Sequence, residues 1–205
     1  MKLNLPNKLT FLRILLVPVI IALGMISENI LPRNISLALL AVIFIGTSVT
    51  DMLDGKIARK RGLITDFGKF LDPIADKFMV IGAMFVIIYK FENFRTVMLL
   101  SLLVVVFREL AVTSMRLVVS TGEGIVIAAN KLGKIKTVSQ IVCISTVFIE
   151  PLVQYVIELF MEAEKYPLHN VFPLSWLTIL FSLVMTVWSG VNYITAYWKY
   201  LDPEK

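Results

Sequence analysis

From residue 51 to residue 76 the chain reads DMLDGKIARKRGLITDFGKFLDPIAD, in which carboxylates recur at short intervals. The rest of the chain is strongly apolar: 58% of all residues are hydrophobic, only 17% are charged, and the mean hydropathy is +0.82. These values lie far outside the range of soluble globular proteins. Acidic side chains at membrane depth are costly and usually face a cavity or an ion path. The sequence therefore predicts an integral membrane protein with a functional site in this stretch.

Six apolar segments are long enough to cross a bilayer, because a helical span needs about 17 to 25 apolar residues. The loops of any size between them are the Asp-rich stretch, Ser120–Lys136 and Met161–Pro173. We therefore predict one all-α membrane domain over residues 1–205, with six transmembrane helices after a short N-terminal interfacial segment. The six predicted spans are Leu9–Ile26, Ile35–Leu53, Pro73–Tyr89, Val97–Val119, Thr137–Phe160 and Leu174–Trp198.

Lys and Arg residues concentrate in alternate loops, and cytoplasmic loops carry such an excess. Only four of the loop residues of this kind fall on the opposite side, namely Arg33, Lys90, Arg95 and Lys165. We therefore predict that both termini and the Asp-rich stretch face the cytoplasm. The formal charge of +5 then belongs mainly to one membrane surface, where it attracts anionic lipids and anionic substrates. We expect no nucleic-acid partner.

The carboxylates of the Asp-rich stretch form two stripes, because helical steps of three, four and seven residues return to nearly the same face. Two facing stripes would bring several like charges together, and each pair about 4 Å apart costs about 4 kcal/mol at an effective dielectric near 20. A positive group must therefore bind there. One stripe holds Asp51, Asp54, Gly55 and Ala58, and the other holds Gly68, Asp72 and Asp76.

The residue types in this stretch favour a hard divalent cation. Carboxylates without a nearby His or Cys prefer Mg²⁺ or Mn²⁺ to zinc, and the single histidine, His169, is predicted on the other side of the membrane. Arg59 is a bidentate donor suited to phosphate, while glycines such as Gly55 and Gly68 let a ligand approach the helix backbone. Together these features indicate a pyrophosphate substrate.

The same residues match a known signature. The pattern Asp51-x2-Asp54-Gly55-x2-Ala58-Arg59-x8-Gly68-x3-Asp72-x3-Asp76 resembles the motif of the CDP-alcohol phosphotransferases, and every fixed position is filled. The resemblance implies a six-helix homodimeric enzyme that transfers a substituted phosphoryl group from a CDP-linked donor to an alcohol and releases CMP. It implies two divalent ions, Mg²⁺ or Mn²⁺, on Asp51, Asp54 and Asp72, with Asp76 as general base and a further metal contact. It also implies a CDP site formed by Asp51, Asp54, Gly55, Ala58, Arg59 and Gly68, with Thr65 as an additional contact.

Basic residues outside the motif indicate an acceptor that itself carries phosphate. Arg108 and Arg116 fall in one sector of the fourth span, and Lys131, Lys134 and Lys136 follow on the same membrane side. Arginines and lysines gathered in this way suit charge-assisted bonds to a dianion. These segments resemble those of the bacterial branch that makes phosphatidylglycerophosphate from CDP-diacylglycerol and glycerol 3-phosphate.

The opening Pro6-Asn7-Lys8-Leu9-Thr10-x2-Arg13 resembles the start of several lipid-synthesising branches of the family. Asn7, Thr10 and Arg13 are therefore either site residues or residues that cap and anchor the first helix. The resemblance as a whole implies a multi-pass enzyme of the bacterial cytoplasmic membrane, in contact with membrane lipids, whose active site faces the cytoplasm. Phosphatidylinositol-phosphate synthase and CDP-dependent cardiolipin synthase remain alternatives. A divalent-cation transporter is a more distant one, because transporters usually hold ions near the bilayer midplane.

Overall fold

The computed structural model describes residues 4–61, 65–122, 131–160 and 171–200, and within these ranges the chain is helical and contains no strand. This confirms the predicted all-α class. A 3-10 turn, η1 (Glu92–Phe94), joins α3 to α4, and a second, η3 (Trp198–Tyr200), follows α6. The six long helices are α1 (Leu5–Met25), α2 (Arg33–Arg61), α3 (Asp66–Lys90), α4 (Arg95–Gly122), α5 (Lys131–Phe160) and α6 (Pro173–Tyr197).

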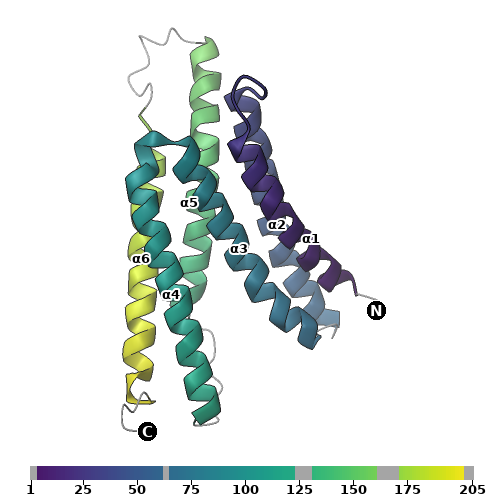
Figure 1. Ribbon diagram of the computed structural model, residues 1–205, viewed down its shortest axis with the longest axis vertical. Coiled ribbons are helices and arrows are strands. Elements are labelled where there is room, and N and C mark those ends of the chain that lie inside the picture. Colours follow the sequence, from purple (N-terminus) through teal and green to yellow (C-terminus); the bar gives the residue numbers. More distant parts are fainter. Residues whose placement is uncertain (1–3, 62–64, 123–130, 161–170, 201–205) are drawn as a thin grey trace.

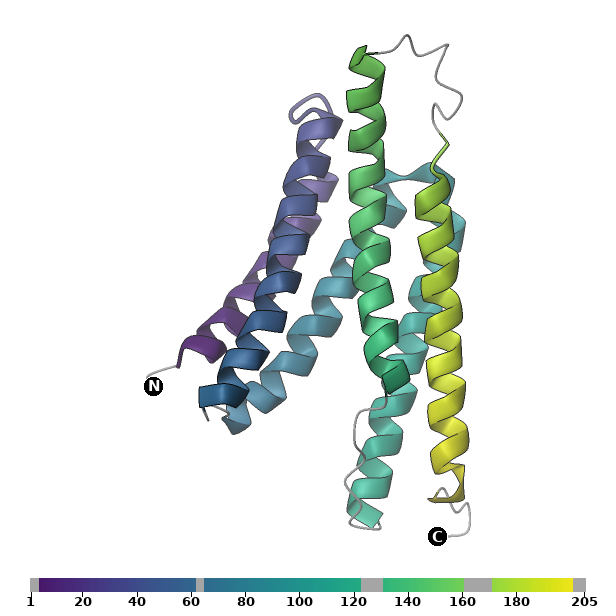
Figure 2. The ribbon, with the colours of Figure 1, turned by 180° about the vertical axis from the view of Figure 1, so that it is seen from behind.

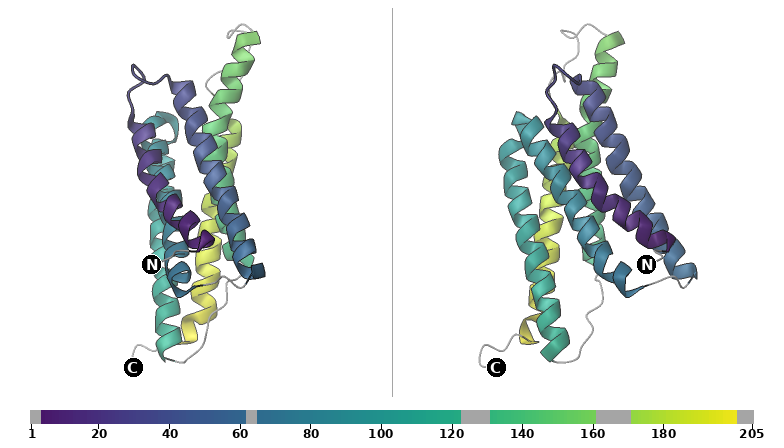
Figure 3. Two further views of the ribbon diagram at one scale, coloured as in Figure 1. Left: turned by 90° about the vertical axis from the view of Figure 1, so that its right-hand side faces the viewer. Right: turned by 45° about the vertical axis from the view of Figure 1, so that its right-hand side comes forward.

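The helices run alternately up and down, so that both termini lie at the same end of the molecule (Figure 1). That end also holds the end of α2 and the start of α3, and we call it the acidic end. Helix α1 packs against α2 and α3, and α5 lies between α2 and α6, as the view from behind shows (Figure 2). The group α1, α2 and α3 leans away from α4, α5 and α6 toward the acidic end (Figures 1 and 3).

Five of the described helices contain stretches long and apolar enough to cross a membrane: Pro6–Met25, Arg33–Leu53, Glu92–Ser120, Lys131–Phe160 and Pro173–Tyr197. Helix α3, which contains the third predicted span, Pro73–Tyr89, is not among them. The physical reason is that Asp76 and Lys77 lie well inside α3 and Lys90 ends it, so its uninterrupted apolar stretch is short. Many large apolar side chains are exposed, such as Val42 at 70% and Leu103 at 67%, as expected of surfaces that contact lipid.

The Asp-rich stretch is helical on both sides of residues 62–64, and the prediction that it is a loop was wrong. Helix α2 continues past Leu53 to Arg61, and α3 begins at Asp66, well before Pro73. Thr65 caps α3, since its hydroxyl accepts a hydrogen bond from the Gly68 N–H at 3.1 Å. Likewise, the basic segment from Lys131 to Lys136 is the first part of α5 and not a loop.

Close packing of α1 on α3 fixes the geometry of the acidic end. A Cβ atom at Gly82 would lie 2.8 Å from Val17 Cγ1, and one at Gly24 would lie 2.4 Å from Val86 Cγ1. The two helices therefore approach closely because these positions lack side chains. Because α1 and α3 run in the same direction, successive turns of one face successive turns of the other. The first turns of α1 are thereby held against the carboxylates of α3.

Candidate active site

Arg13 joins the two acidic stripes. Its Nη1 atom lies 2.6 Å from Asp51 Oδ1 on α2 and 2.8 Å from Asp76 Oδ1 on α3. The arginine side chain is 3% exposed, whereas the two carboxylates are 38% and 42% exposed. Because Arg13 contacts Oδ1 of each carboxylate and both carboxylates are partly exposed, their other oxygens are accessible to a ligand at the acidic end.

The other residues of the α1 opening also contact α3. Thr10 Oγ1 donates to Asp72 Oδ1 at 2.6 Å, and Asn7 Nδ2 donates to Thr65 Oγ1 at 3.0 Å. Gly68 is buried beneath this contact, because a Cβ there would lie 2.8 Å from Asn7 Oδ1. The structure thus gives Gly68 a role in helix packing and Thr65 a role as a cap, and their contact with CDP stays a prediction.

Several predicted site residues lie outside these contacts. Gly55 is half-buried on α2, while the side chains of Asp54, Ala58 and Arg59, on the last turns of the same helix, lie outside the described residues. Asp66, which lies outside the fixed positions of the motif and was not predicted as a ligand, is exposed and pairs with Lys69 at 2.9 Å. That hydrogen bond lowers the pKa of the Asp66 carboxyl, and the pair lies on the solvent side of α3.

The carboxylates suit a hard cation in their donor chemistry. Among the described side chains there is no ready-made group of three or more metal ligands, but the side chain of Asp54 is not among them. A positive guanidinium nitrogen already lies between oxygens of Asp51 and Asp76. The Arg13 guanidinium thus already supplies one positive charge to these two carboxylates, and a metal ion would have to bind through their remaining oxygens, which are the ligand type that Mg²⁺ and Mn²⁺ prefer.

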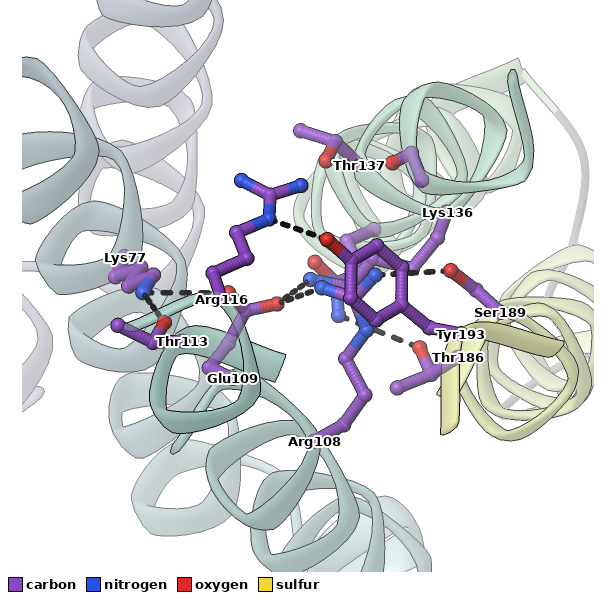
Figure 4. Close-up of polar contacts among 12 residues, drawn as sticks. Lys77, Arg108, Glu109, Thr113, Arg116, Lys136, Thr137, Thr186, Ser189 and Tyr193 are labelled. Atoms are coloured by element: carbon purple, nitrogen blue, oxygen red, sulfur yellow. Dashed lines mark hydrogen bonds and ion pairs between the residues drawn. The ribbon is translucent and has the colours of Figure 1, made fainter. Parts of the chain in front are cut away.

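A second polar group lies between α3, α4, α5 and α6, and Figure 4 shows it around Glu109. Arg108 Nη1 donates to Glu109 Oε1 at 2.8 Å, and Lys136 pairs with the same oxygen. Lys77 Nζ lies 3.5 Å from Glu109 Oε2 and donates to Thr113 Oγ1 at 2.9 Å. We call this group the basic cluster, and its members are Lys77, Arg108, Glu109, Arg116 and Lys136.

Helix α6 supports both arginines of the basic cluster. Arg108 Nη2 donates to Ser189 Oγ at 2.9 Å. Arg116 Nε donates to the Tyr193 hydroxyl at 2.7 Å, and its guanidinium lies 5.3 Å from the centre of the tyrosine ring. Arg108 and Arg116, which the sequence placed in one sector of a helix, are thus held by a common partner helix.

The predicted row of lysines is split. Lys136 is buried against Glu109, whereas Lys131 and Lys134 are exposed at the start of α5. The cause is helical geometry, since residues two positions apart, such as Lys134 and Lys136, lie on nearly opposite sides of a helix. A single cluster from Lys131 to Lys136 is therefore not what the structure contains.

Sequence reasoning did not include four residues of this region in the predicted site: Lys77, Glu109, Ser189 and Tyr193. For Glu109 a signal was present, because an acid inside an apolar segment needs a partner, and the adjacent Arg108 is an evident one; the structure contains this pair. Lys77 directly follows Asp76, but from the sequence it is only one of the many basic residues on the side predicted to be cytoplasmic. Ser189 and Tyr193 share one face of α6 at a spacing of four residues, yet nothing local links them to arginines far away in the sequence.

Comparison with known proteins gives a consistent result. The sequence model of the CDP-alcohol phosphatidyltransferase family matches residues 3–195. A CDP-diacylglycerol–glycerol-3-phosphate 3-phosphatidyltransferase of Bacillus subtilis (strain 168) is 39% identical over 205 residues, covering 97% of each chain. Enzymes with the same name are 38% identical in Rickettsia typhi (strain Wilmington), over 69% of this chain and 74% of the relative, and 29% identical in Yersinia pestis (strain Pestoides F), over 97% of each. This chain therefore belongs to the CDP-alcohol phosphatidyltransferase family.

Proposed function

We propose that this protein transfers the phosphatidyl group of CDP-diacylglycerol to glycerol 3-phosphate, forming phosphatidylglycerophosphate and CMP. The relatives that carry this activity in their names match nearly the whole chain. The structural observation that supports the proposal lies on α3, where consecutive residues contact two different polar groups. Asp76 contacts Arg13 near Asp51, while Lys77 contacts Glu109 in the basic cluster. Donor and acceptor sites would therefore adjoin each other across a single turn of helix.

The acidic end would be the donor site. Asp51, Asp54, Asp72 and Asp76 would hold two divalent ions, which when bound neutralise the diphosphate and the departing CMP. Arg13 keeps Asp51 and Asp76 close together through its contacts with both carboxylates, and Thr10 orients Asp72 through a hydrogen bond of 2.6 Å. Gly55, Ala58, Arg59, Thr65 and Gly68 would line the CDP group.

The basic cluster would bind the phosphate of glycerol 3-phosphate, because guanidinium and ammonium groups form strong charge-assisted bonds to a dianion. Asp76 would accept the proton of the primary hydroxyl group. The hydroxyl oxygen would then attack the β-phosphorus of the donor, and the bond from that phosphorus to the CMP oxygen would break. Exposed Lys131 and Lys134 would attract the anion to the site.

The lipid part of the donor would stay in the membrane. A groove between α1 and α2 is lined by Leu12, Leu16, Val42 and Gly46 and reaches Arg13. One acyl chain would lie there while the CDP group occupies the acidic end. This arrangement requires α3 to cross the membrane as a sixth span, with both termini and the active site in the cytoplasm of a bacterial cell. As in the family, we expect a homodimer.

The test is a reconstituted reaction. Purified protein in mixed micelles, given CDP-diacylglycerol, labelled glycerol 3-phosphate and Mg²⁺, should release CMP and label a lipid in equal amounts. Asp76→Asn should abolish this release, whereas Asp66→Asn, which removes an exposed carboxylate from the same helix, should not. Absence of CMP, or its release only with inositol phosphate or phosphatidylglycerol as acceptor, would overturn the proposal.

A further inference from the structure

Glu109 is an anion at the centre of a group of cations. Its side chain is 15% exposed, and it faces Arg108 from its own helix, Lys136 from α5 and Lys77 from α3. One carboxylate thus holds positive charges from three helices in a fixed relation (Figure 4). The charges do not cancel, because the basic cluster contains four cations and one anion.

Tyr193 plays a corresponding part for Arg116. The tyrosine is 3% exposed, so its hydroxyl is held in place by packing. It accepts a hydrogen bond from Arg116 Nε at 2.7 Å, and the terminal nitrogens of the guanidinium point away from the tyrosine (Figure 4). Those terminal nitrogens form the edge that binds phosphate in bidentate contacts.

Arg108 adds an independent sign of a missing partner. Its Nε atom is a buried donor, and in the described part of the chain it has no hydrogen-bond acceptor. Buried donors are nearly always paired, since leaving one unpaired is costly. The side chain also lies against two glycines: a Cβ at Gly190 would be 3.1 Å from Arg108 Cγ, and one at Gly133 would be 3.7 Å from Arg108 Nη2.

From these contacts we infer that Glu109 and Tyr193 are positioning residues for the acceptor phosphate. Glu109 holds the side chains of Arg108, Lys136 and Lys77 around its carboxylate. Tyr193 holds Nε of Arg116, so that the two terminal nitrogens of that guanidinium point away from the tyrosine. The inference rests on the proposed function, in which that phosphate belongs to glycerol 3-phosphate. It extends the acceptor site to α6 through Tyr193, and it gives the carboxylate Glu109 a role in binding a phosphate anion.

The Glu109→Gln variant separates this inference from simple electrostatics. Removing a negative charge makes the basic cluster more positive, so attraction alone predicts tighter binding of the acceptor and a lower KM for it. Positioning predicts the opposite, because Arg108, Lys136 and Lys77 would then repel one another and move apart. We expect the KM for glycerol 3-phosphate to rise about tenfold or more, as for the loss of a hydrogen bond to a charged group. The KM for CDP-diacylglycerol should stay unchanged.

The Tyr193→Phe variant keeps the ring and removes only the hydroxyl group, so it should fold even if Glu109→Gln does not. We expect the KM for glycerol 3-phosphate to rise several-fold while kcat at saturating acceptor is retained. Tyr89→Phe, at the far end of α3, serves as the matched control and should change neither value. Calorimetric titration of each variant with glycerol 3-phosphate should show the same order of affinities without turnover.

Different results distinguish a failure of the proposed function from a failure of the roles of Glu109 and Tyr193. If the unaltered protein makes no CMP from CDP-diacylglycerol and glycerol 3-phosphate, the proposed function fails. If it does, but Glu109→Gln lowers the KM for the acceptor or leaves it unchanged, the role of Glu109 is refuted. If Tyr193→Phe shifts the KM for both substrates equally, or shifts neither, the role of Tyr193 is refuted.

Discussion

The most informative perturbation is Arg13→Met, because Arg13 joins Asp51 to Asp76. Its Nη1 atom contacts one oxygen of each carboxylate, at 2.6 and 2.8 Å, so these oxygens are at most about 5.4 Å from each other. Methionine is apolar and unbranched, so it can fill much of the buried space of the arginine stem. Without the guanidinium the two carboxylates face each other uncompensated.

The magnitude follows from that separation. Two like charges about 5 Å apart cost about 3 kcal/mol at an effective dielectric near 20. Because the carboxylates are 38% and 42% exposed, solvent screening reduces the loss to about 1 to 2 kcal/mol. For a chain of this size such a loss lowers Tm by roughly 2 to 8 °C. A divalent cation between the carboxylates would remove the same repulsion.

The assay is thermal unfolding in detergent, with and without Mg²⁺. Arg13→Met should unfold at lower temperature than the unaltered protein in the absence of metal, and Mg²⁺ should raise its Tm by more. Arg95→Met is the control, because it removes only exposed contacts, namely the pair of Arg95 with Glu92 at 3.4 Å and the hydrogen bond from Arg95 Nε to the Ile88 carbonyl at 3.3 Å, and exposed pairs of this kind contribute little to stability. If Mg²⁺ stabilises Arg13→Met no more than the unaltered protein, Arg13 does not neutralise the repulsion between Asp51 and Asp76.

Three further predictions concern single residues. Asp76→Asn should still bind CDP-diacylglycerol in a filter-binding assay but lose all turnover, whereas Asp51→Asn should lose metal-dependent binding; equal mild effects would contradict these roles. Gly68→Ala should lower the free energy of unfolding by about 1 to 3 kcal/mol, since its Cβ would lie 2.8 Å from Asn7 Oδ1; an unchanged Tm would argue against the close packing. Gly46→Leu should fold normally, because an added Cβ at this position meets nothing within 4 Å. It should raise the KM for long-chain CDP-diacylglycerol and leave the KM for glycerol 3-phosphate unchanged. If the variant and the unaltered protein have the same KM for CDP-diacylglycerol, the groove does not hold an acyl chain.

The helices were predictable because their signals are local. Five of the six predicted spans correspond to helices that can cross a membrane by length and composition. The errors lie where a helix continues beyond its apolar part, as α2 does from Leu53 to Arg61. Hydropathy indicates only the part of a helix that lies in the membrane interior, whereas the helix boundaries are set by caps such as Thr65 at the start of α3.

The candidate site was predictable only in part. The spacing of Asp51, Asp72 and Asp76 placed them on facing stripes, and the structure brings Asp51 and Asp76 to one guanidinium. Arg13 was visible as a charge inside an apolar segment, but its partner was not, since Asp76 lies 63 positions away along the chain. The opposite error occurred for Lys131 and Lys134, which sequence proximity joined to Lys136 and helix geometry separates from it.

Composition and short-range spacing were enough to predict a helical membrane protein and the chemistry of its acidic motif, because both depend on residues that are near neighbours in the chain. The packing of the helices against one another decided which charged residues pair with each other. Glycines at Gly24 and Gly82 allow α1 to reach α3, and this approach brings Arg13 to the carboxylates. In the same way, α6 brings Ser189 and Tyr193 to the arginines of α4. A buried ion needs a partner within a few ångströms, and the fold can supply one that is distant in sequence, as Asp76 is from Arg13.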